Sequence, residues 1–178
     1  MATLENILIS SVGIRNSLKK YKPLKSLAEY VWNGFDAQAS KVEINITLNS
    51  LQNVESIIVK DDGYGIDRSL LNNKFKPFFQ SEKVYDPDIK HSTTHGKNGV
   101  GRLTFFTFST LAKWNTVYEH DNKKFSYTIS VDSNSLNEFN PTPEEETSYP
   151  VGTSVSFFNI FGDELSIDTI KEYLAKEF

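Results

Sequence analysis

Residues 24–48 of this chain read LKSLAEYVWNGFDAQASKVEINITL, and they predict a helix followed directly by a strand. Apolar residues recur at the i, i+3, i+4, i+7 spacing of one helix face over residues 24–37. From residue 42 the spacing changes to strict alternation, which predicts a strand with one face in water over 42–48. The apolar helix positions that we expect to be buried are Leu24, Leu27, Ala28, Val31, Trp32 and Phe35.

Further strand patterns follow, separated by polar turns. Ile57–Val59 predicts a strand that runs straight into the sequence DDGYG. The segment 72–98 fits no regular element, and long segments of that kind are usually functional lids or disordered. The other expected elements are strands over 114–119 and 124–131 joined by the turn 120–122, a strand over 151–160, helices over about 4–19, 100–111 and 166–178, and a polar acidic loop over 133–150.

The length and composition are those of one soluble domain spanning residues 1–178. The chain is 38% hydrophobic and 24% charged, which is ordinary for a globular protein. It has no Cys, which excludes disulfides, thiol catalysis and cysteine-based metal sites. Its three His argue against a multi-histidine metal centre. The last helix pattern ends without a C-cap glycine, so we expect the N-terminal part of a longer protein with a downstream domain.

The net charge of −4 gives no support for bulk binding to nucleic acid or to anionic membranes, although it leaves room for a local basic patch. Nucleic-acid contacts are therefore expected only through regions outside this chain. The sequence has no apolar run of about 18 residues and no basic segment before its first apolar stretch. We therefore expect a cytoplasmic protein that does not contact a membrane.

Three polar residues lie along one line of the predicted helix 24–37. At 100° per residue, Glu29, Asn33 and Asp36 fall within about 60° of arc. A solvent-facing helix surface would give the same spacing. Trp32 and Phe35 bracket the line, however, and Asn33 and Gly34 are poor helix formers, so the line is also a candidate for one wall of a cleft.

The motif DDGYG, Asp61–Gly65, follows a predicted strand. Its glycines allow a sharp turn and a close approach of a flat ligand to the backbone. A carboxylate at the strand end, Asp61, can accept a hydrogen bond from an exocyclic amine. Asp-Gly pairs are also common in plain turns, and this motif alone does not decide between the two interpretations.

A second glycine cluster, HGKNGVGR, spans His95–Arg102. Its three glycines expose successive backbone N–H groups, and a following helix would add its positive N-terminus, which together suit a phosphate. Lys97 and Arg102 are candidate sources of positive charge. The spacing fits neither a P-loop nor a dinucleotide-binding G-x-G-x-x-G motif, and a flexible glycine loop would look the same.

The order of these motifs resembles the Bergerat-fold ATPases, the superfamily that contains gyrase, the Hsp-ninety chaperones, histidine kinases and MutL. The resemblance covers about residues 24–162, and within the superfamily the chain is most similar to MutL and the MORC-type ATPases. It rests on E-x3-N-x2-D-A (Glu29, Asn33, Asp36, Ala37), D-x-G-x-G (Asp61, Gly63, Gly65), G-x2-G-x-G (Gly96, Gly99, Gly101) and Gly152-Thr153 at the start of a strand.

The resemblance implies an α/β two-layer sandwich, with helices over one face of a mixed, mostly antiparallel sheet, and ATP between the helices and a lid. It implies that Glu29 is the general base, that Asn33 binds Mg²⁺, and that Asp36 is structural or lies near the general base. Asp61 would accept the adenine amine, with Gly63 and Gly65 beside the base and Thr153 as a second adenine contact. The lid would be formed by Gly96, Lys97, Asn98, Gly99, Val100 and Gly101.

The resulting functional hypothesis is an Mg²⁺-dependent domain that binds ATP or ADP, hydrolyses ATP slowly, and switches conformation or forms a homodimer when ATP binds. Two alternatives stay open: a histidine-kinase-like phosphotransfer domain, and an ATP-sensing module without turnover. MutL-like enzymes complete their site with a Lys from a following domain, and this chain contains no such domain. The kinase branch commonly lacks a base at the position of Glu29, which favours hydrolysis.

Overall fold

The computed structural model describes residues 9–76, 78 and 100–178. Its centre is a seven-stranded sheet in the order β1-β2-β7-β3-β4-β5, with β6 also paired to β4, and every pairing within these residues is antiparallel. The strands are β1 (Val42–Leu48), β2 (Val54–Asp61), β3 (Ser109–His120), β4 (Lys123–Asp132), β5 (Asn140–Pro141), β6 (Glu145–Glu146) and β7 (Gly152–Ile160).

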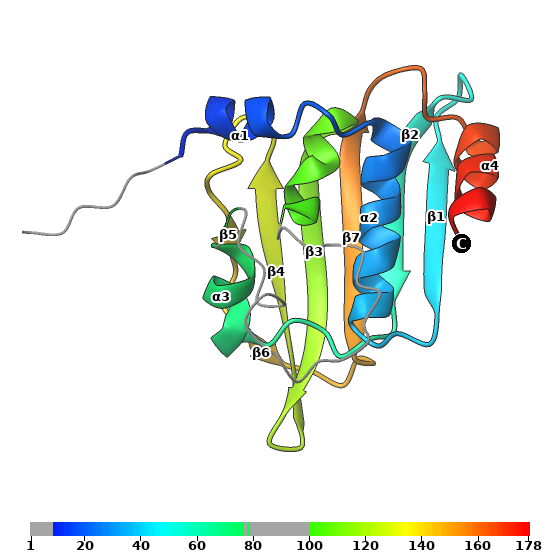
Figure 1. Cartoon of the computed structure of the whole chain (residues 1–178). Coiled ribbons are helices and arrows are strands. Elements are labelled where there is room, and N and C mark those ends of the chain that lie inside the picture. The colour runs from blue at the N-terminus through cyan, green and yellow to red at the C-terminus, as the bar shows by residue number, and fades with distance from the viewer. Residues whose placement is uncertain (1–8, 77, 79–99) are drawn as a thin grey trace, which may run out of the picture.

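Helices pack on one face of this sheet, as Figure 1 shows for α2 and the green 3-10 helix η3 beside it. The expected two-layer α/β sandwich with a mostly antiparallel sheet is therefore confirmed. The helices are α1 (Ser11–Ser17), α2 (Pro23–Asp36), η1 (Arg68–Leu70), α3 (Leu71–Phe75), η3 (Gly101–Thr107) and α4 (Ile167–Glu177).

Helix α2 packs against the sheet and against η3. It begins with Pro23 at its first turn, a position where the missing N–H costs nothing. Leu27, Ala28 and Val31 are buried against the sheet as predicted. The Tyr30 ring packs edge-on against Phe157 of β7, with 4.7 Å between ring centroids.

The prediction that Phe35 is buried was wrong, because 42% of its surface is exposed. Gly34 faces the sheet in this turn of α2, since a Cβ there would lie 2.8 Å from Val42 of β1. Phe35 instead forms an aromatic group with Trp32 and Phe178, at centroid distances of 6.3 and 5.8 Å. The aromatic side of α2 therefore covers the end of α4 rather than the sheet.

The helix predicted over 100–111 is shorter than expected. Only Gly101–Thr107 is helical, as a 3-10 helix, and β3 begins at Ser109. Ser109 and Leu111 pair with Ile160 and Phe158 of β7, so strand pairing overrides the local pattern there. At the N-terminus the described helix is Ser11–Ser17, within the predicted 4–19, of which residues 4–8 lie outside the described part.

The predicted hairpin of β3 and β4 is confirmed. Its two-residue loop, Asp121 and Asn122, has positive φ angles of 51° and 61°, as tight hairpin turns require. The predicted C-terminal helix is α4, whose N-terminus carries a capping box of Ser166 and Thr169. Strands β2 and β7 are distant in the sequence but pair in the sheet. This pairing brings two predicted site residues, Asp61 and Thr153, opposite each other.

Candidate functional site

Asp61, the last residue of β2, lies at the centre of the candidate site. Its Oδ1 accepts hydrogen bonds from the backbone N–H groups of Gly63 (2.9 Å) and Thr153 (3.3 Å). Within the described residues, its second carboxylate oxygen receives no hydrogen bond. One oxygen therefore fixes the side chain, and the other is available to a donor on a ligand.

The environment of Asp61 changes its acidity. Burial raises the pKa of this carboxyl above its ordinary value, and the nearby Asp62 acts in the same direction. The N–H groups of Gly63 and Thr153 stabilise the ionised form and offset part of that rise. Asp61 is thus a half-buried acid at a strand end, which is typical of a group that works on a ligand.

Gly34 lets helix α2 lie directly against this carboxylate. A Cβ at Gly34 would lie 2.8 Å from Val42 and 3.1 Å from the Cβ of Asp61. Any larger residue would push the helix off the sheet at this point. The sequence indicated Gly34 only as a poor helix former, and its role as the contact between α2 and Asp61 was not predicted.

The DDGYG segment is packed more closely than a surface turn needs to be. A Cβ at Gly63 would lie 2.5 Å from the carbonyl oxygen of Ala37, at the end of α2. Gly65 has a φ of +72°, and a Cβ there would lie 2.1 Å from the carbonyl oxygen of Val117 in β3. The absence of a side chain at these two glycines thus lets the turn pass closely between the end of α2 and β3.

Two threonines connect this turn to β7. Thr153, which is buried, lies opposite Asp61 in the sheet, and its Oγ1 is 3.1 Å from Oγ1 of Thr116. Thr116 Oγ1 in turn accepts a hydrogen bond from the N–H of Ile66 at 2.9 Å. Thr116 was not predicted, because a threonine on a long strand carries no signal of its own.

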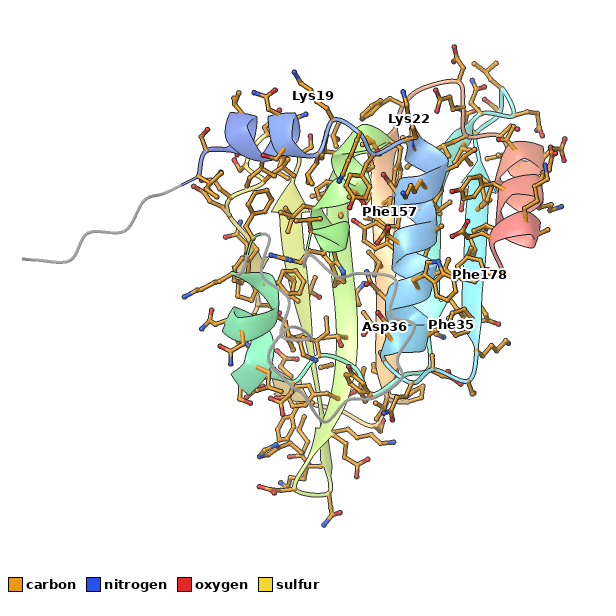
Figure 2. All side chains as sticks on the ribbon, viewed as in Figure 1. Lys19, Lys22, Phe35, Asp36, Phe157 and Phe178 are labelled. Carbon is orange, nitrogen blue, oxygen red and sulfur yellow. The ribbon has the colours of Figure 1, made fainter. Side chains whose placement is uncertain are left out.

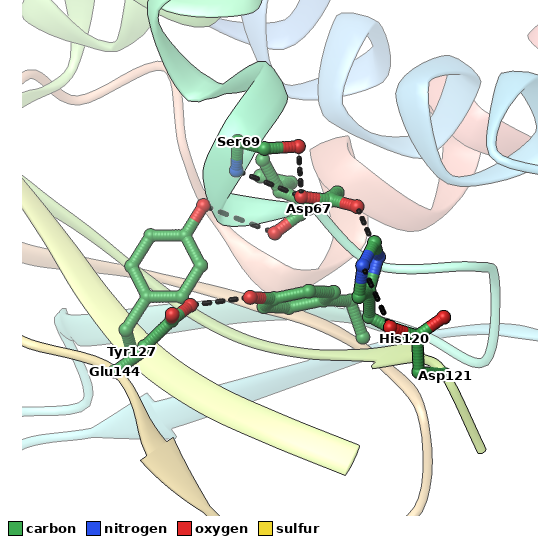
Figure 3. A network of polar contacts seen from close by, with 8 residues as sticks. Asp67, Ser69, His120, Asp121, Tyr127 and Glu144 are labelled. Atoms are coloured by element: carbon green, nitrogen blue, oxygen red, sulfur yellow. Dashed lines mark hydrogen bonds and ion pairs between the residues drawn. The ribbon is translucent and has the colours of Figure 1, made fainter. Parts of the chain in front are cut away.

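A polar network holds the loop that follows Gly65 (Figure 3). Asp67 accepts hydrogen bonds from the N–H and hydroxyl of Ser69, and its other oxygen lies 3.5 Å from Nδ1 of His120. Although burial opposes it, these bonds keep the pKa of Asp67 below its ordinary value. The Tyr127 hydroxyl donates to the Ile66 carbonyl at 3.0 Å, and the Tyr118 hydroxyl donates to Glu144.

The polar line on α2 is present as predicted, with different exposure at each position. Glu29 and Asp36 are half-buried, whereas Asn33 is exposed. Figure 2 shows Asp36 at the end of α2 that meets the DDGYG turn. Towards the other end of the helix, Gly101 lies against Glu29, because a Cβ on Gly101 would be 3.1 Å from Glu29 Oε2.

Helix α2 also holds the start of η3 in place. The Tyr30 hydroxyl donates to the Arg102 carbonyl at 2.8 Å, and burial raises the pKa of Tyr30 far above its ordinary value. The Arg102 guanidinium donates to the carbonyl of Phe75 at 2.7 Å, and burial lowers its pKa to about 10. Arg102, a candidate phosphate-binding cation in the sequence, thus has a structural contact at the end of α3.

The predicted lid lies mostly outside the described residues. This applies to Gly96, Lys97, Asn98 and Gly99, whereas Val100 and Gly101 are described. Val100 is buried in the core, so its side chain anchors the segment. Among the described residues, the contact between Gly101 and Glu29 connects the predicted lid to the polar line on α2.

A separate cavity of about 710 Å³ lies on the opposite face of the sheet. It reaches Asp61 and Thr153, but its wall includes side chains that alternate with the core-facing ones, such as Lys60, Asn115 and Ser154. It therefore borders the candidate site at Asp61 and Thr153 but opens away from α2, and no sequence motif predicted it.

Comparison with known proteins then identifies the family. Residues 21–157 match the family model described as "Histidine kinase-, DNA gyrase B-, and HSP90-like ATPase". The chain belongs to this ATPase family. The matched range includes α2, the DDGYG turn, the second glycine cluster and Thr153, so it contains every motif on which the predicted resemblance rested.

One curated relative is the DNA mismatch repair protein MutL of Buchnera aphidicola subsp. Schizaphis graminum (strain Sg). It is 26% identical over 140 residues, which cover 79% of this chain and 22% of that protein. The chain therefore spans about a fifth of the length of this relative. Among the described residues, no helix is long and apolar enough to cross a membrane.

Family membership makes this chain an ATP-binding domain, and the described residues fit that ligand. The Asp61 carboxylate keeps one oxygen for a donor, and the close packing at Gly34 and Gly63 holds α2 and the turn against this residue. An amide oxygen at Asn33 and a carboxylate at Glu29 are hard oxygen donors, the kind that Mg²⁺ prefers. The described residues therefore include oxygen donors of the kind that a nucleotide-bound metal uses.

Proposed function

We propose that this domain binds Mg²⁺-ATP with adenine against Asp61 and hydrolyses it slowly, with Glu29 as the general base. The observation that carries the proposal is that the Asp61 and Glu29 carboxylates are both placed along α2, Asp61 by packing against the helix and Glu29 as one of its residues. Gly34 sets one end of that helix against Asp61, and Gly101 lies against Glu29 one and a half turns earlier. A nucleotide lying along α2 would reach both.

Adenine recognition would depend on the fixed carboxylate. The available oxygen of Asp61 would accept the exocyclic N–H of adenine, and Gly63 and Gly65 would allow the flat base close to the backbone. Thr153 would contribute a second contact, through water. A guanine base presents a carbonyl oxygen at that position, and two acceptors facing each other repel. We therefore expect adenine nucleotides to be preferred.

The phosphates would lie along the exposed part of the same helix stripe. Asn33 would hold Mg²⁺ through its amide oxygen, which is the kind of hard oxygen ligand that Mg²⁺ prefers. When bound, the metal neutralises charge on the phosphates. Asp36 would support this end of the stripe, and the backbone N–H groups of Gly96–Gly101 would bind the phosphate oxygens as a lid.

Glu29 would orient the attacking water and take its proton. It is half-buried, and Gly101 lies beside it without a side chain in between, so a phosphate held by the Gly101 N–H would be close to the carboxylate. Phosphoryl transfer needs this combination of positioning and charge neutralisation rather than covalent chemistry by the protein. A completing Lys from a downstream domain would increase the rate.

The output would be a nucleotide-dependent conformational change or homodimer, coupled to the rest of a longer protein in the cytoplasm. The carboxylate at Glu29 supports hydrolysis over a histidine-kinase-like transfer, and ATP sensing without turnover stays open as the other alternative. All three share the same binding site and differ only in the fate of the γ-phosphate.

Measurement of that fate in Glu29→Ala tests the proposal, with Glu55→Ala, an exposed glutamate on β2, as the matched control. Since general base catalysis contributes roughly 10²–10⁴-fold, phosphate release should fall by that factor while ATP affinity stays within about twofold. The Glu55→Ala variant should match wild type. If Glu29→Ala hydrolyses ATP as fast as wild type, another group is the general base. Transfer of label from the γ-phosphate of ATP to a protein side chain would favour the kinase alternative. ATP binding by wild type without any turnover would favour the ATP-sensing alternative.

A further inference from the structure

Four exposed lysines gather where α1 meets α2. We call Lys19, Lys20, Lys22 and Lys25 the lysine patch. The surrounding segment 9–28 contains one further cation, Arg15, and no acidic residue at all, although the chain as a whole has a net charge of −4. The concentration of positive charge is therefore a local property of this segment.

These lysines are not neutralised from within the described part of the chain. None of their ammonium groups forms an ion pair with a described carboxylate. Lys20 and Lys25 instead lie over the ring of Tyr21, at 5.8 and 5.9 Å from its centroid. The arrangement is an aromatic ring flanked by cations at the surface.

The patch is presented by a well-anchored piece of backbone. Leu18 is fully buried, and the N–H of Tyr21 donates to the Leu18 carbonyl at 3.0 Å, which closes a turn before Pro23 starts α2. Figure 2 shows Lys19 and Lys22 at the opposite end of α2 from Asp36. The backbone that carries the lysines is thus anchored away from the adenine end of the candidate site.

The patch also opposes what a helix start prefers. The N-terminus of a helix carries a partial positive charge, so anionic residues stabilise it and cations destabilise it. Lys22 is the N-cap of α2, it makes no side-chain capping bond, and the first turn contains Lys25 and no acidic residue. A local rule broken in this way, with no carboxylate among the described residues paired to these lysines, points to an external anion.

We propose that the lysine patch binds the phosphate backbone of a nucleic acid, independently of base sequence. Densely spaced phosphates complement several lysines in a short segment, and the helix N-terminus adds to the attraction. The leucines next to the lysines in the sequence, Leu18 and Leu24, pack into the core, whereas Ile9 and Val12 earlier in the segment are exposed, so the vesicles in the experiment below test a bilayer as the alternative partner. The proposal places a nucleic-acid contact within this chain, where the net charge had predicted none.

The experiment compares two variants of the whole chain by fluorescence anisotropy, with a labelled DNA duplex, the matching single strand and vesicles rich in anionic lipid as probes. In the first variant Lys19, Lys20, Lys22 and Lys25 become Gln. In the second, four exposed lysines elsewhere, Lys60, Lys123, Lys171 and Lys176, become Gln, so that the total charge change is the same.

The patch variant should bind the nucleic acid roughly 10- to 100-fold more weakly than wild type, and its affinity should depend less steeply on salt between about 50 and 200 mM. The control variant should stay close to wild type. Because the lysines oppose the helix dipole, the melting temperature of the patch variant should be equal or higher, which separates lost binding from lost folding. Equal losses in both variants, or binding to vesicles without binding to nucleic acid, would overturn the proposal.

Discussion

Asp61 and Thr153 face each other in the β2–β7 pairing, and the Thr153 N–H donates to Asp61 Oδ1 at 3.3 Å. The two residues are separated by 92 positions in the sequence. The antiparallel register of two central strands therefore sets the geometry of the proposed adenine contact. A change that shifts this register should disturb nucleotide binding even where it touches no ligand.

The close packing of the DDGYG turn predicts a large stability effect at Gly65. An Ala there would adopt an unfavourable positive φ and bring its Cβ within 2.1 Å of the Val117 carbonyl oxygen. Gly162 is the matched control, since its φ is +88° and a Cβ there meets nothing within 4 Å. In urea unfolding, Gly162→Ala should lose about 1 kcal/mol and Gly65→Ala about 3 kcal/mol or more. Equal losses would mean that the turn relaxes and does not constrain the site.

The raised pKa of Asp61 predicts a pH-dependent effect of Asp61→Asn on stability. The folded state holds the Asp61 proton more tightly than the unfolded state does, so this residue stabilises the fold at low pH. That contribution is lost as the pH rises from the ordinary value of 3.8 through the raised native pKa. Asparagine keeps an acceptor oxygen without a charge.

The difference in unfolding free energy, Asp61→Asn minus wild type, should therefore grow as the pH rises through that window and then level off. Urea unfolding of both proteins at a series of pH values measures it, and the other carboxylates cancel because both proteins contain them. A difference that is constant or shrinks with rising pH would show that burial does not dominate the acidity of Asp61.

Asn33 predicts a metal-dependent affinity for ATP. If its amide oxygen binds Mg²⁺, Asn33→Ala should weaken Mg²⁺-ATP binding, and EDTA should weaken binding to wild type but change the variant little. Asn45→Ala, an exposed asparagine on β1, is the control and should behave as wild type. If Asn33→Ala binds ATP as tightly as wild type in the presence of Mg²⁺, Asn33 does not bind the metal.

Much of the fold was predictable because its elements have strong local patterns. The helix over 24–37 and the strand over 42–48 each follow one periodicity, and the hairpin loop needs the positive φ that Asp121 and Asn122 tolerate. The segment 109–111 was mispredicted, because its strand structure comes from pairing with β7 and no local pattern records that pairing.

The residues of the candidate site likewise fall into those that a local motif predicted and those that it did not. Asp61, Gly63 and Gly65 were predictable from one compact motif, and the described structure brings them together with Thr153. Thr116 and Gly34 were missed because their roles exist only once β3 and α2 have packed against the turn. The prediction for Gly96, Lys97, Asn98 and Gly99 falls outside the described residues and stays a prediction.

The most direct test of adenine recognition at Asp61 is calorimetric titration of the chain with Mg²⁺-ATP and Mg²⁺-GTP, for wild type and Asp61→Ala. A lost hydrogen bond to a charged group costs about 1.5–3 kcal/mol. ATP should therefore bind wild type roughly ten- to a hundredfold more tightly than GTP, and Asp61→Ala should lose ATP affinity by a similar factor. Equal affinities of wild type for ATP and GTP, or undiminished ATP binding by Asp61→Ala, would contradict the account.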